Sequence, residues 1–252
     1  MADILSTLSD FLFPQAIPLW QALLLIGFSF FTSLLAASIG IGGGVAMMGA
    51  MSSMIPVSHL IAVHGLVQLG SNSGRAFLLK SHISWPIVWG FAGGGILGAV
   101  LGGYLFVSLP EDILMAALGG FLLWVVWAPK IPLPYAEHWG MPLVGATASF
   151  FAMFFGAMGP LVNAVLQRKG LDKQQLIGTQ SACLILQHGL KIIVLLALGI
   201  SLKEWMGMII LMILMGFAGT YTGTHILQKI PERAFQKGLK VILTLIALDL
   251  LR

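Results

Sequence analysis

The stretch Gly40-Ile41-Gly42-Gly43-Gly44 decides the fold, because it interrupts an apolar sequence that is otherwise long enough to cross a membrane. The run from Leu19 to Ile39 precedes it, and residues 44–55 follow it before Pro56. A bilayer needs about 20 apolar residues, so the second piece is too short to span it. Each glycine costs roughly 1 kcal/mol of helix stability relative to alanine, so we expect the helix to break here. The freed backbone groups cannot face lipid, and such breaks line the substrate sites of transporters.

The composition indicates a membrane protein with many spans. The chain has 252 residues, of which 58% are hydrophobic and 9% are charged, whereas soluble domains have about 25% charged residues. The net charge of +4 is distributed over short loops and helix ends, so no nucleic-acid partner is expected. The single cysteine, Cys183, excludes an internal disulfide and a CxxC site. The residues before Leu19 lack the basic start of a cleaved signal peptide, so we expect a retained first span.

The apolar pattern predicts an all-α integral membrane protein with about eight transmembrane helices. The expected spans are residues 19–39, 58–80, 86–108, 112–128, 141–158, 174–199, 204–227 and 234–251. Two short apolar pieces, 44–55 and 160–168, follow the first and fifth spans and are expected to be re-entrant or broken helices after glycine-rich turns. A proline-rich linker at 129–140 separates a first four-helix repeat, residues 1–128, from a second, residues 141–252.

The division into two repeats is based on residues that recur at a fixed separation. At 116 residues the matches are Gly40 with Gly156, Gly43 with Gly159, Leu60-Ile61 with Leu176-Ile177, and Arg75 with Lys191. At 121 residues the matches are Gly98 with Gly219, Gly102 with Gly223, and Pro110-Glu111 with Pro231-Glu232. A separation that holds over many positions indicates a duplication. The glycines spaced four residues apart from Gly90 to Gly102 indicate close helix packing.

The distribution of basic residues predicts the orientation. If each short piece only dips into the membrane, two basic clusters, Arg168/Lys169/Lys173 and Lys229/Arg233/Lys237, lie on one side. The positive-inside rule makes that side cytoplasmic and both termini extracytoplasmic. Because four spans is an even number, we expect two parallel repeats related by an axis along the membrane normal.

Polar residues form a stripe on one span of each half. The first stripe is His64, Gln68, Ser71, Asn72 and Arg75, and the second is Gln180, Gln187, His188 and Lys191. Their spacings place each stripe on one helix face. Nine apolar residues follow Lys191, so its ammonium is expected inside the hydrocarbon layer. All acidic residues lie in termini, loops or span ends. The simplest compensation for the embedded cations is a bound anion.

Short helices beginning after Gly44 and after Pro160 would strengthen that anion site. Helix N-termini present free N–H groups and partial positive charge, and they bind anions. The complete set of expected substrate-binding residues is Gly42, Gly43, Gly44, His64, Gln68, Asn72, Arg75, Gly159, Asn163, Gln180, Gln187, His188 and Lys191.

Alternative interpretations of these residues stay open. Polar residues in spans often only bridge helices, for around 0.6 kcal/mol each, and Arg75 could extend to the membrane interface beside Lys80. The sequence has no HExxH helix, and its glycine loop follows a membrane span rather than a strand. No metal, cofactor or enzymatic activity is therefore expected. An intramembrane hydrolase that uses Ser71 or Ser73 with His64 or His188 is an alternative, as is an anion channel.

The glycine motif at 40–44, its thinner echo at Gly156–Pro160 and the two similar halves resemble the TauE/SafE (TSUP) family of sulfite-exporter-like permeases. The resemblance implies a bacterial inner-membrane protein that transports small sulfur-containing anions such as sulfite, sulfonates, sulfoacetate or thiosulfate. We therefore expect a secondary transporter that works by alternating access at a midplane site. Its expected partners are the anion, the lipid bilayer and coupling protons carried by His64 or His188, and a homodimer is left open.

Overall fold

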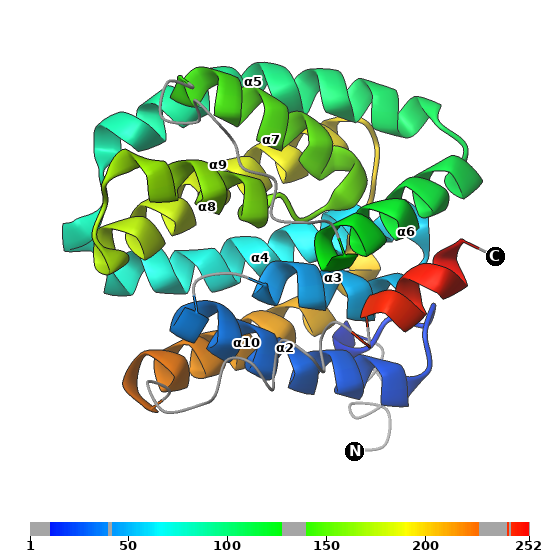
Figure 1. Ribbon diagram of the computed structural model, residues 1–252. Coiled ribbons are helices and arrows are strands. Elements are labelled where there is room, and N and C mark those ends of the chain that lie inside the picture. The colour runs from blue at the N-terminus through cyan, green and yellow to red at the C-terminus, as the bar shows by residue number, and fades with distance from the viewer. Residues whose placement is uncertain (1–10, 40–41, 128–139, 227–240, 242, 252) are drawn as a thin grey trace.

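The computed structural model describes residues 11–39, 42–127, 140–226, 241 and 243–251, and these contain helices and no strands (Figure 1). The predicted all-helical class is confirmed. Several features of the sequence lie wholly or partly outside the described residues: Gly40 and Ile41 of the glycine motif, the linker up to residue 139, the basic cluster Lys229/Arg233/Lys237, the pair Pro231-Glu232, and residues 234–240 and 242 of the last expected span.

The described helices, as labelled in Figure 1, are α2 (Leu19–Ile39), α3 (Gly43–Ser52), α4 (Val57–Leu78), α5 (Trp85–Ser108), α6 (Glu111–Trp127), α7 (Met141–Phe155), α8 (Gly159–Leu166), α9 (Lys173–Ala197) and α10 (Met206–Ile226). Short 3-10 turns lie at Lys80–His82, Gln167–Lys169 and Lys203–Trp205. Residues 243–250 are also helical. The two short helices lie where the sequence predicts a break, but α3 begins at Gly43 and α8 at Gly159, slightly before the expected starts after Gly44 and Pro160.

Several of these helices are suited to lipid. In the described part of the chain, four are long and apolar enough to cross a membrane: Leu19–Ser38, Trp85–Ser108, Lys173–Ala197 and Lys203–Gly223. The outward side chains of α5 and α10 are large and apolar, including Leu97, Leu101 and Leu214. The polar stripe lowers the hydropathy of α4, although its 22 residues give a length of about 33 Å. The chain is therefore an integral membrane protein.

The helices form three layers, with α4 and α9 in the middle (Figure 1). The pair α5 and α7 covers one side of this middle layer, and the pair α2 and α10 covers the other. Glycines bring the outer pairs together. A Cβ atom on Gly98 would overlap the Ala146 carbonyl, and one on Gly219 would overlap the Phe30 carbonyl. Only glycine permits so close an approach of two helix backbones.

The same contact occurs twice, once in each outer pair. Gly98 and Gly219 are separated by 121 residues, and the carbonyls that they meet, at Ala146 and Phe30, are separated by 116. A second set behaves in the same way, because a Cβ on Gly95 would lie 3.2 Å from Ser149 Oγ and one on Gly216 would lie 2.9 Å from Ser33 Oγ. These are the two separations at which the sequence repeats.

The middle helices run in opposite directions. Arg75, near the end of α4, contacts Ser181 in the first half of α9, whereas Gly65, earlier in α4, lies against Lys191 later in α9. The matched stripes are therefore antiparallel. The expectation of parallel repeats about an axis along the membrane normal is wrong, because that axis would make α4 and α9 parallel.

The short helices explain this error. Helix α2 runs parallel to α10, since Phe30 and Leu34 meet Gly219 and Gly223 in the same order. Helix α4 also runs parallel to α10, since a Cβ on Gly70 would meet Ile213 and one on Gly74 would meet Phe217. Helices α2 and α4 thus share a direction, and α3 carries the chain back between them. Because the short helix takes the chain to the other side, each half crosses an odd number of times, and the expected even number of spans is wrong.

Candidate functional site

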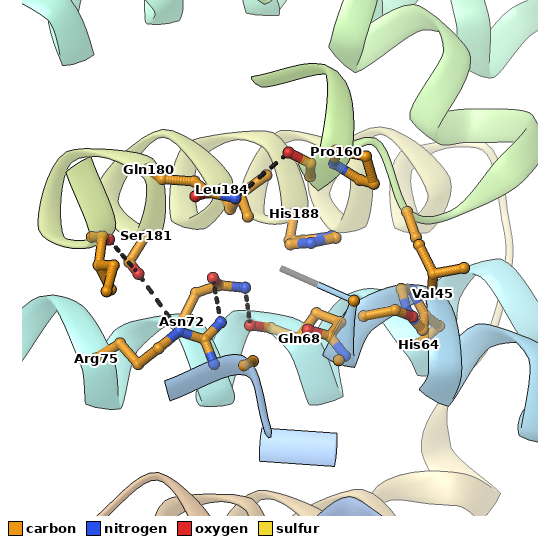
Figure 2. Close-up of a pocket in the computed structure, with 17 residues that line it drawn as sticks. Val45, His64, Gln68, Asn72, Arg75, Pro160, Gln180, Ser181, Leu184 and His188 are labelled. Atoms are coloured by element: carbon orange, nitrogen blue, oxygen red, sulfur yellow. Dashed lines mark hydrogen bonds between the residues drawn. The ribbon is translucent and has the colours of Figure 1, made fainter. Parts of the chain in front are cut away.

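A pocket lies where the first turns of α3 and α8 meet the polar stripes of α4 and α9 (Figure 2). Most of the expected substrate-binding residues line it, namely Gly42, Gly43, Gly44, His64, Gln68, Asn72, Arg75, Gly159, Gln180 and His188. The other lining residues are Ala36, Val45, Ala157, Pro160, Ile177, Ser181 and Leu184. Figure 2 shows the α4 side chains facing those of α9 across this space.

Arg75 supplies the positive charge of the pocket. Its side chain is only 6% exposed, so the alternative in which it extends to the membrane interface is wrong. Nη1 donates to Ser71 Oγ at 3.1 Å, Nη2 donates to Asn72 Oδ1 at 2.6 Å, and Nε donates to Ser181 Oγ at 3.4 Å. All three acceptors are neutral. The guanidinium has five N–H donors, so these bonds leave donors available to a ligand.

Asn72 orients the guanidinium. Its Nδ2 donates to the backbone carbonyl of Gln68 at 2.7 Å, which directs its Oδ1 toward Arg75. The Ser71 hydroxyl that accepts from Arg75 lies 2.9 Å from Ser33 Oγ, so a residue of α2 supports the same network. A buried network whose members are all bonded holds its side chains in one arrangement.

Two matched side chains hold the short helices against the long ones. His64 Nε2 donates to the Gly44 carbonyl at 2.9 Å, which ties α3 to α4. Gln180 Nε2 donates to the Gly159 carbonyl at 3.3 Å, which ties α8 to α9. Asn163 donates to Gln180 Oε1 at 2.6 Å, so it supports this tether from behind the pocket lining.

The glycines of the pocket differ in what they allow. Gly42 has a φ of 95° at the start of α3, a conformation that side chains rarely adopt. A Cβ on Gly43 would overlap the Thr32 carbonyl, so this glycine permits close packing on α2. A Cβ on Gly44 or Gly159 would make only ordinary contacts, 3.4 Å from Gln68 and 3.5 Å from Leu184. The first N–H groups of both helices have no partner within their own helix and carry partial positive charge.

Three expected residues lie outside the pocket lining. Besides Asn163, these are Gln187, whose Nε2 donates to the Ala148 carbonyl at 3.3 Å, and Lys191, whose Nζ donates to the Gly156 carbonyl at 3.2 Å. Lys191 is 1% exposed, so it is embedded as expected. The two embedded cations do not converge, however, and Arg75 is the one that lines the pocket.

His188 occupies the centre of the site. Its ring lies 5.9 Å from that of His64 with an interplanar angle of 73°. The Nδ1 atoms of both rings are buried without a hydrogen-bond partner in the described part of the chain. No acidic side chain appears among the described residues of the lining, and these residues contain no group of three or more His, Cys, Asp or Glu that could hold a metal ion. The charged group of the described lining is thus the Arg75 guanidinium, and the His188 imidazole faces the same space.

Comparison with known proteins shows which family the chain belongs to. The family model for sulfite exporter TauE/SafE matches residues 25–250. The chain belongs to the TauE/SafE family. The probable inner membrane transporter protein TsaS of Comamonas testosteroni is 24% identical over 181 residues, which cover 67% of this chain and 72% of that protein. No solved structure matches the chain significantly. Family membership makes the protein a membrane permease, as the sequence resemblance predicted.

The sequence missed some lining residues of this TauE/SafE chain. Ser181 accepts from Arg75 and follows Gln180 directly, so its position in a polar stripe could have identified it. The aliphatic residues Ile177 and Leu184 carry no such signal, because apolar side chains look the same whether they face lipid, core or pocket. Their place in the lining depends on how α8 packs on α9.

Proposed function

We propose that this TauE/SafE protein is a secondary transporter that binds a small sulfur-containing anion at Arg75 and moves it by alternating access. One observation carries the proposal: the Arg75 guanidinium is buried among neutral acceptors, in a membrane-embedded pocket whose described lining has no carboxylate. A charge at membrane depth costs at least ~2.5 kcal/mol unless it is compensated. An anion supplies that compensation.

The chemistry of the pocket favours an oxyanion. Sulfite, thiosulfate and sulfonates carry several oxygens that can accept two parallel hydrogen bonds from a guanidinium. We assign the binding of these oxygens to Arg75 and His188, together with the first-turn N–H groups of α3 and α8. His64, Gln180 and Asn163 would position those turns through the Gly44 and Gly159 carbonyls. Proton coupling through His64 or His188 belongs to the same proposal, because an imidazole can take up and release a proton.

The proposed architecture consists of two inverted repeats, residues 1–128 and 141–252, joined by the linker 129–140, and each repeat has about four spans plus one short helix that changes sides. It is supported by the duplicated glycine contacts at Ala146 and Phe30 and by the antiparallel crossing of α4 and α9. Inverted repeats place a substrate site at their interface near the midplane, and rocking one repeat against the other exposes it to each side in turn.

The proposed orientation follows from charge. Lys80, Arg168 and Lys173 lie at the end of the molecule where α4 ends and α9 begins. Glu111 and Glu204 lie at the opposite end, where α6 and α10 begin. The positive-inside rule makes the first end cytoplasmic. Both termini would then be extracytoplasmic, because α2 starts at the opposite end and the helix at residues 243–250 points toward that end (Figure 1).

The test is uptake of ³⁵S-labelled sulfite and thiosulfate into proteoliposomes that contain the full chain. We expect saturable uptake that an internal load of the same anion accelerates, and we expect Arg75→Met to abolish it. Thermal-shift measurements with sulfite, thiosulfate and sulfoacetate should show stabilisation by mass action. Conductance without saturation would favour the channel alternative. Absence of both binding and flux for all of these anions would refute the proposal.

The hydrolase alternative has little support from the site. Ser71 Oγ is engaged by Ser33 and Arg75, and Ser73 is exposed on another face of α4. A serine nucleophile needs a base within hydrogen-bond reach. In the described part of the chain, neither His64 nor His188 hydrogen-bonds to Ser71 or Ser73.

A further inference from the structure

Lys191 occupies on α9 the position that Arg75 occupies on α4. The two cations are separated by 116 residues, as are the residues that they contact on the opposite helix, since Gly65 lies against Lys191 and Ser181 lies against Arg75. The positions are equivalent but the surroundings are not. Arg75 lines the pocket, whereas Lys191 is enclosed and donates to the Gly156 carbonyl.

The polar groups near Arg75 are hydrogen-bonded, whereas two of the equivalent groups near Lys191 are not. Arg75 donates to Ser71, which in turn lies within hydrogen-bond distance of Ser33. The residues at the equivalent positions in the second half are Gln187 and Ser149. Gln187 Oε1 and Ser149 Oγ are buried and have no hydrogen-bond partner in the described part of the chain. Such atoms are uncommon in native structures and require an explanation.

Because α4 and α9 are antiparallel, Arg75 and Lys191 lie toward opposite ends of the molecule. Arg75 lies in the last turn of α4, toward the end of the molecule where α9 begins. Lys191 lies past the midpoint of α9, toward the end where α4 begins. Arg75 and His64 appear on opposite sides of the pocket in Figure 2. When the two inverted repeats exchange conformations, the surroundings of one cation would therefore open while those of the other close.

We propose that Lys191 is the centre of a second anion-binding position, which is closed here and forms when the transporter faces the opposite side. In that state Lys191 leaves the Gly156 carbonyl and donates to Gln187 Oε1, one turn away, as Arg75 donates to Ser71. The position takes the same small sulfur oxyanion. This inference rests on the proposed function and adds a second cationic step to the path of the anion.

The first experiment separates binding from exchange. Thiosulfate affinity in detergent and ³⁵S-thiosulfate exchange in proteoliposomes are measured for the wild type, Lys191→Met and a control, Lys203→Met, which removes an exposed lysine. We expect Lys191→Met to bind thiosulfate within about threefold of the wild type, since Arg75 holds the anion in the present state, but to lose at least about tenfold in exchange rate. Lys203→Met should retain both. An exchange rate equal to that of the wild type, or a loss of both thiosulfate binding and exchange, would overturn the role of Lys191.

A second experiment does not require a substitution at Lys191. Ile177 lines the present pocket, and Ile61, at the equivalent position, is 1% exposed. Cysteines are introduced singly at these positions in a Cys183→Ala background and labelled with a membrane-impermeant maleimide. We expect Ile177→Cys to react from one side of the membrane and Ile61→Cys to react only from the other side, and only when thiosulfate drives exchange. Failure of Ile61→Cys to react under exchange would overturn the second position, whereas absence of thiosulfate binding by the wild type would refute the proposed function instead.

Discussion

Arg75 Nε on α4 donates a hydrogen bond to Ser181 Oγ on α9 across 3.4 Å, so residues separated by 106 positions in the chain share one charged contact. Ser181 donates its own proton to the Ile177 carbonyl at 2.8 Å, which leaves its oxygen free to accept from Arg75. The position of the guanidinium in the pocket therefore depends on how the two middle helices lie against each other. Any movement of α4 against α9 changes how many of the guanidinium N–H groups are available to an anion.

Replacement of Arg75 should separate the effect of charge from that of geometry. Arg75→Met removes the cation, and we expect anion affinity to fall by roughly 2–5 kcal/mol. Arg75→Lys retains the charge but cannot reach Ser71, Asn72 and Ser181 with one planar group, so we expect a smaller loss, about tenfold. Isothermal titration with sulfite and thiosulfate measures both. Arg168→Met, which removes a surface arginine, is the matched control, and tight binding by Arg75→Met would contradict the assignment.

Two adjacent glycines at the start of α3 should respond differently to the same added methyl group. Gly43→Ala places a Cβ into the Thr32 carbonyl, so we expect α3 to separate from α2 and the stability to fall by about 1–3 kcal/mol. Gly44→Ala places its Cβ 3.4 Å from Gln68 Oε1, so the fold should persist while the methyl group narrows the pocket. Thermal melting and thiosulfate affinity distinguish the two effects. Equal melting temperatures would contradict the packing role of Gly43.

Much of this arrangement could be predicted from the sequence, because the causes are local. Glycines break a helix wherever they cluster, so the start of α3 at Gly43 follows from the motif itself. The helical period places His64, Gln68 and Arg75 on one face before any tertiary contact is known. The nine apolar residues after Lys191 also identified this second cation as an embedded residue, and it is 1% exposed.

The direction of the helices could not be predicted, because it depends on where α3 and α8 end rather than on their composition. A dip that returns to the same side and a short helix that changes sides have the same apolar sequence. The placement of Lys191 failed for a related reason. The stripes match residue by residue, but matched positions in antiparallel helices face opposite ends of the molecule, so Lys191 lies against Gly156 and not beside Arg75.

The glycines of the outer helix pairs should be sensitive in matched positions. Gly98→Ala and Gly219→Ala each place a Cβ into a backbone carbonyl, of Ala146 and of Phe30. We expect both to lose about 1–3 kcal/mol, since backbone cannot move aside as a side chain can. A Cβ on Gly93 would have nothing within 4 Å, so Gly93→Ala should be neutral or gain up to about 1 kcal/mol. Melting temperatures of the three variants in detergent test this, and a stable Gly98→Ala would argue against the close crossing of α5 and α7.

His64 should be replaceable by the residue found at its equivalent position. Gln180 ties α8 to α9 through the Gly159 carbonyl, as His64 ties α3 to α4 through the Gly44 carbonyl. We expect His64→Gln to keep this hydrogen bond and melt near the wild type. His64→Leu leaves the Gly44 carbonyl without its partner and should lose about 1–3 kcal/mol. If both variants melt alike, the tether does not stabilise α3.

The orientation of the chain can be tested with two exposed serines that bracket α4. Ser53 precedes this helix and Ser81 follows it, so the length of α4 separates them by about 33 Å. Ser81 lies at the end that carries Lys80, Arg168 and Lys173, which the positive-inside rule makes cytoplasmic. In a Cys183→Ala background, we expect Ser53→Cys to react with a membrane-impermeant maleimide added to intact spheroplasts. Ser81→Cys should react only after the membrane is permeabilised. The reverse pattern would invert the proposed topology and place both termini in the cytoplasm.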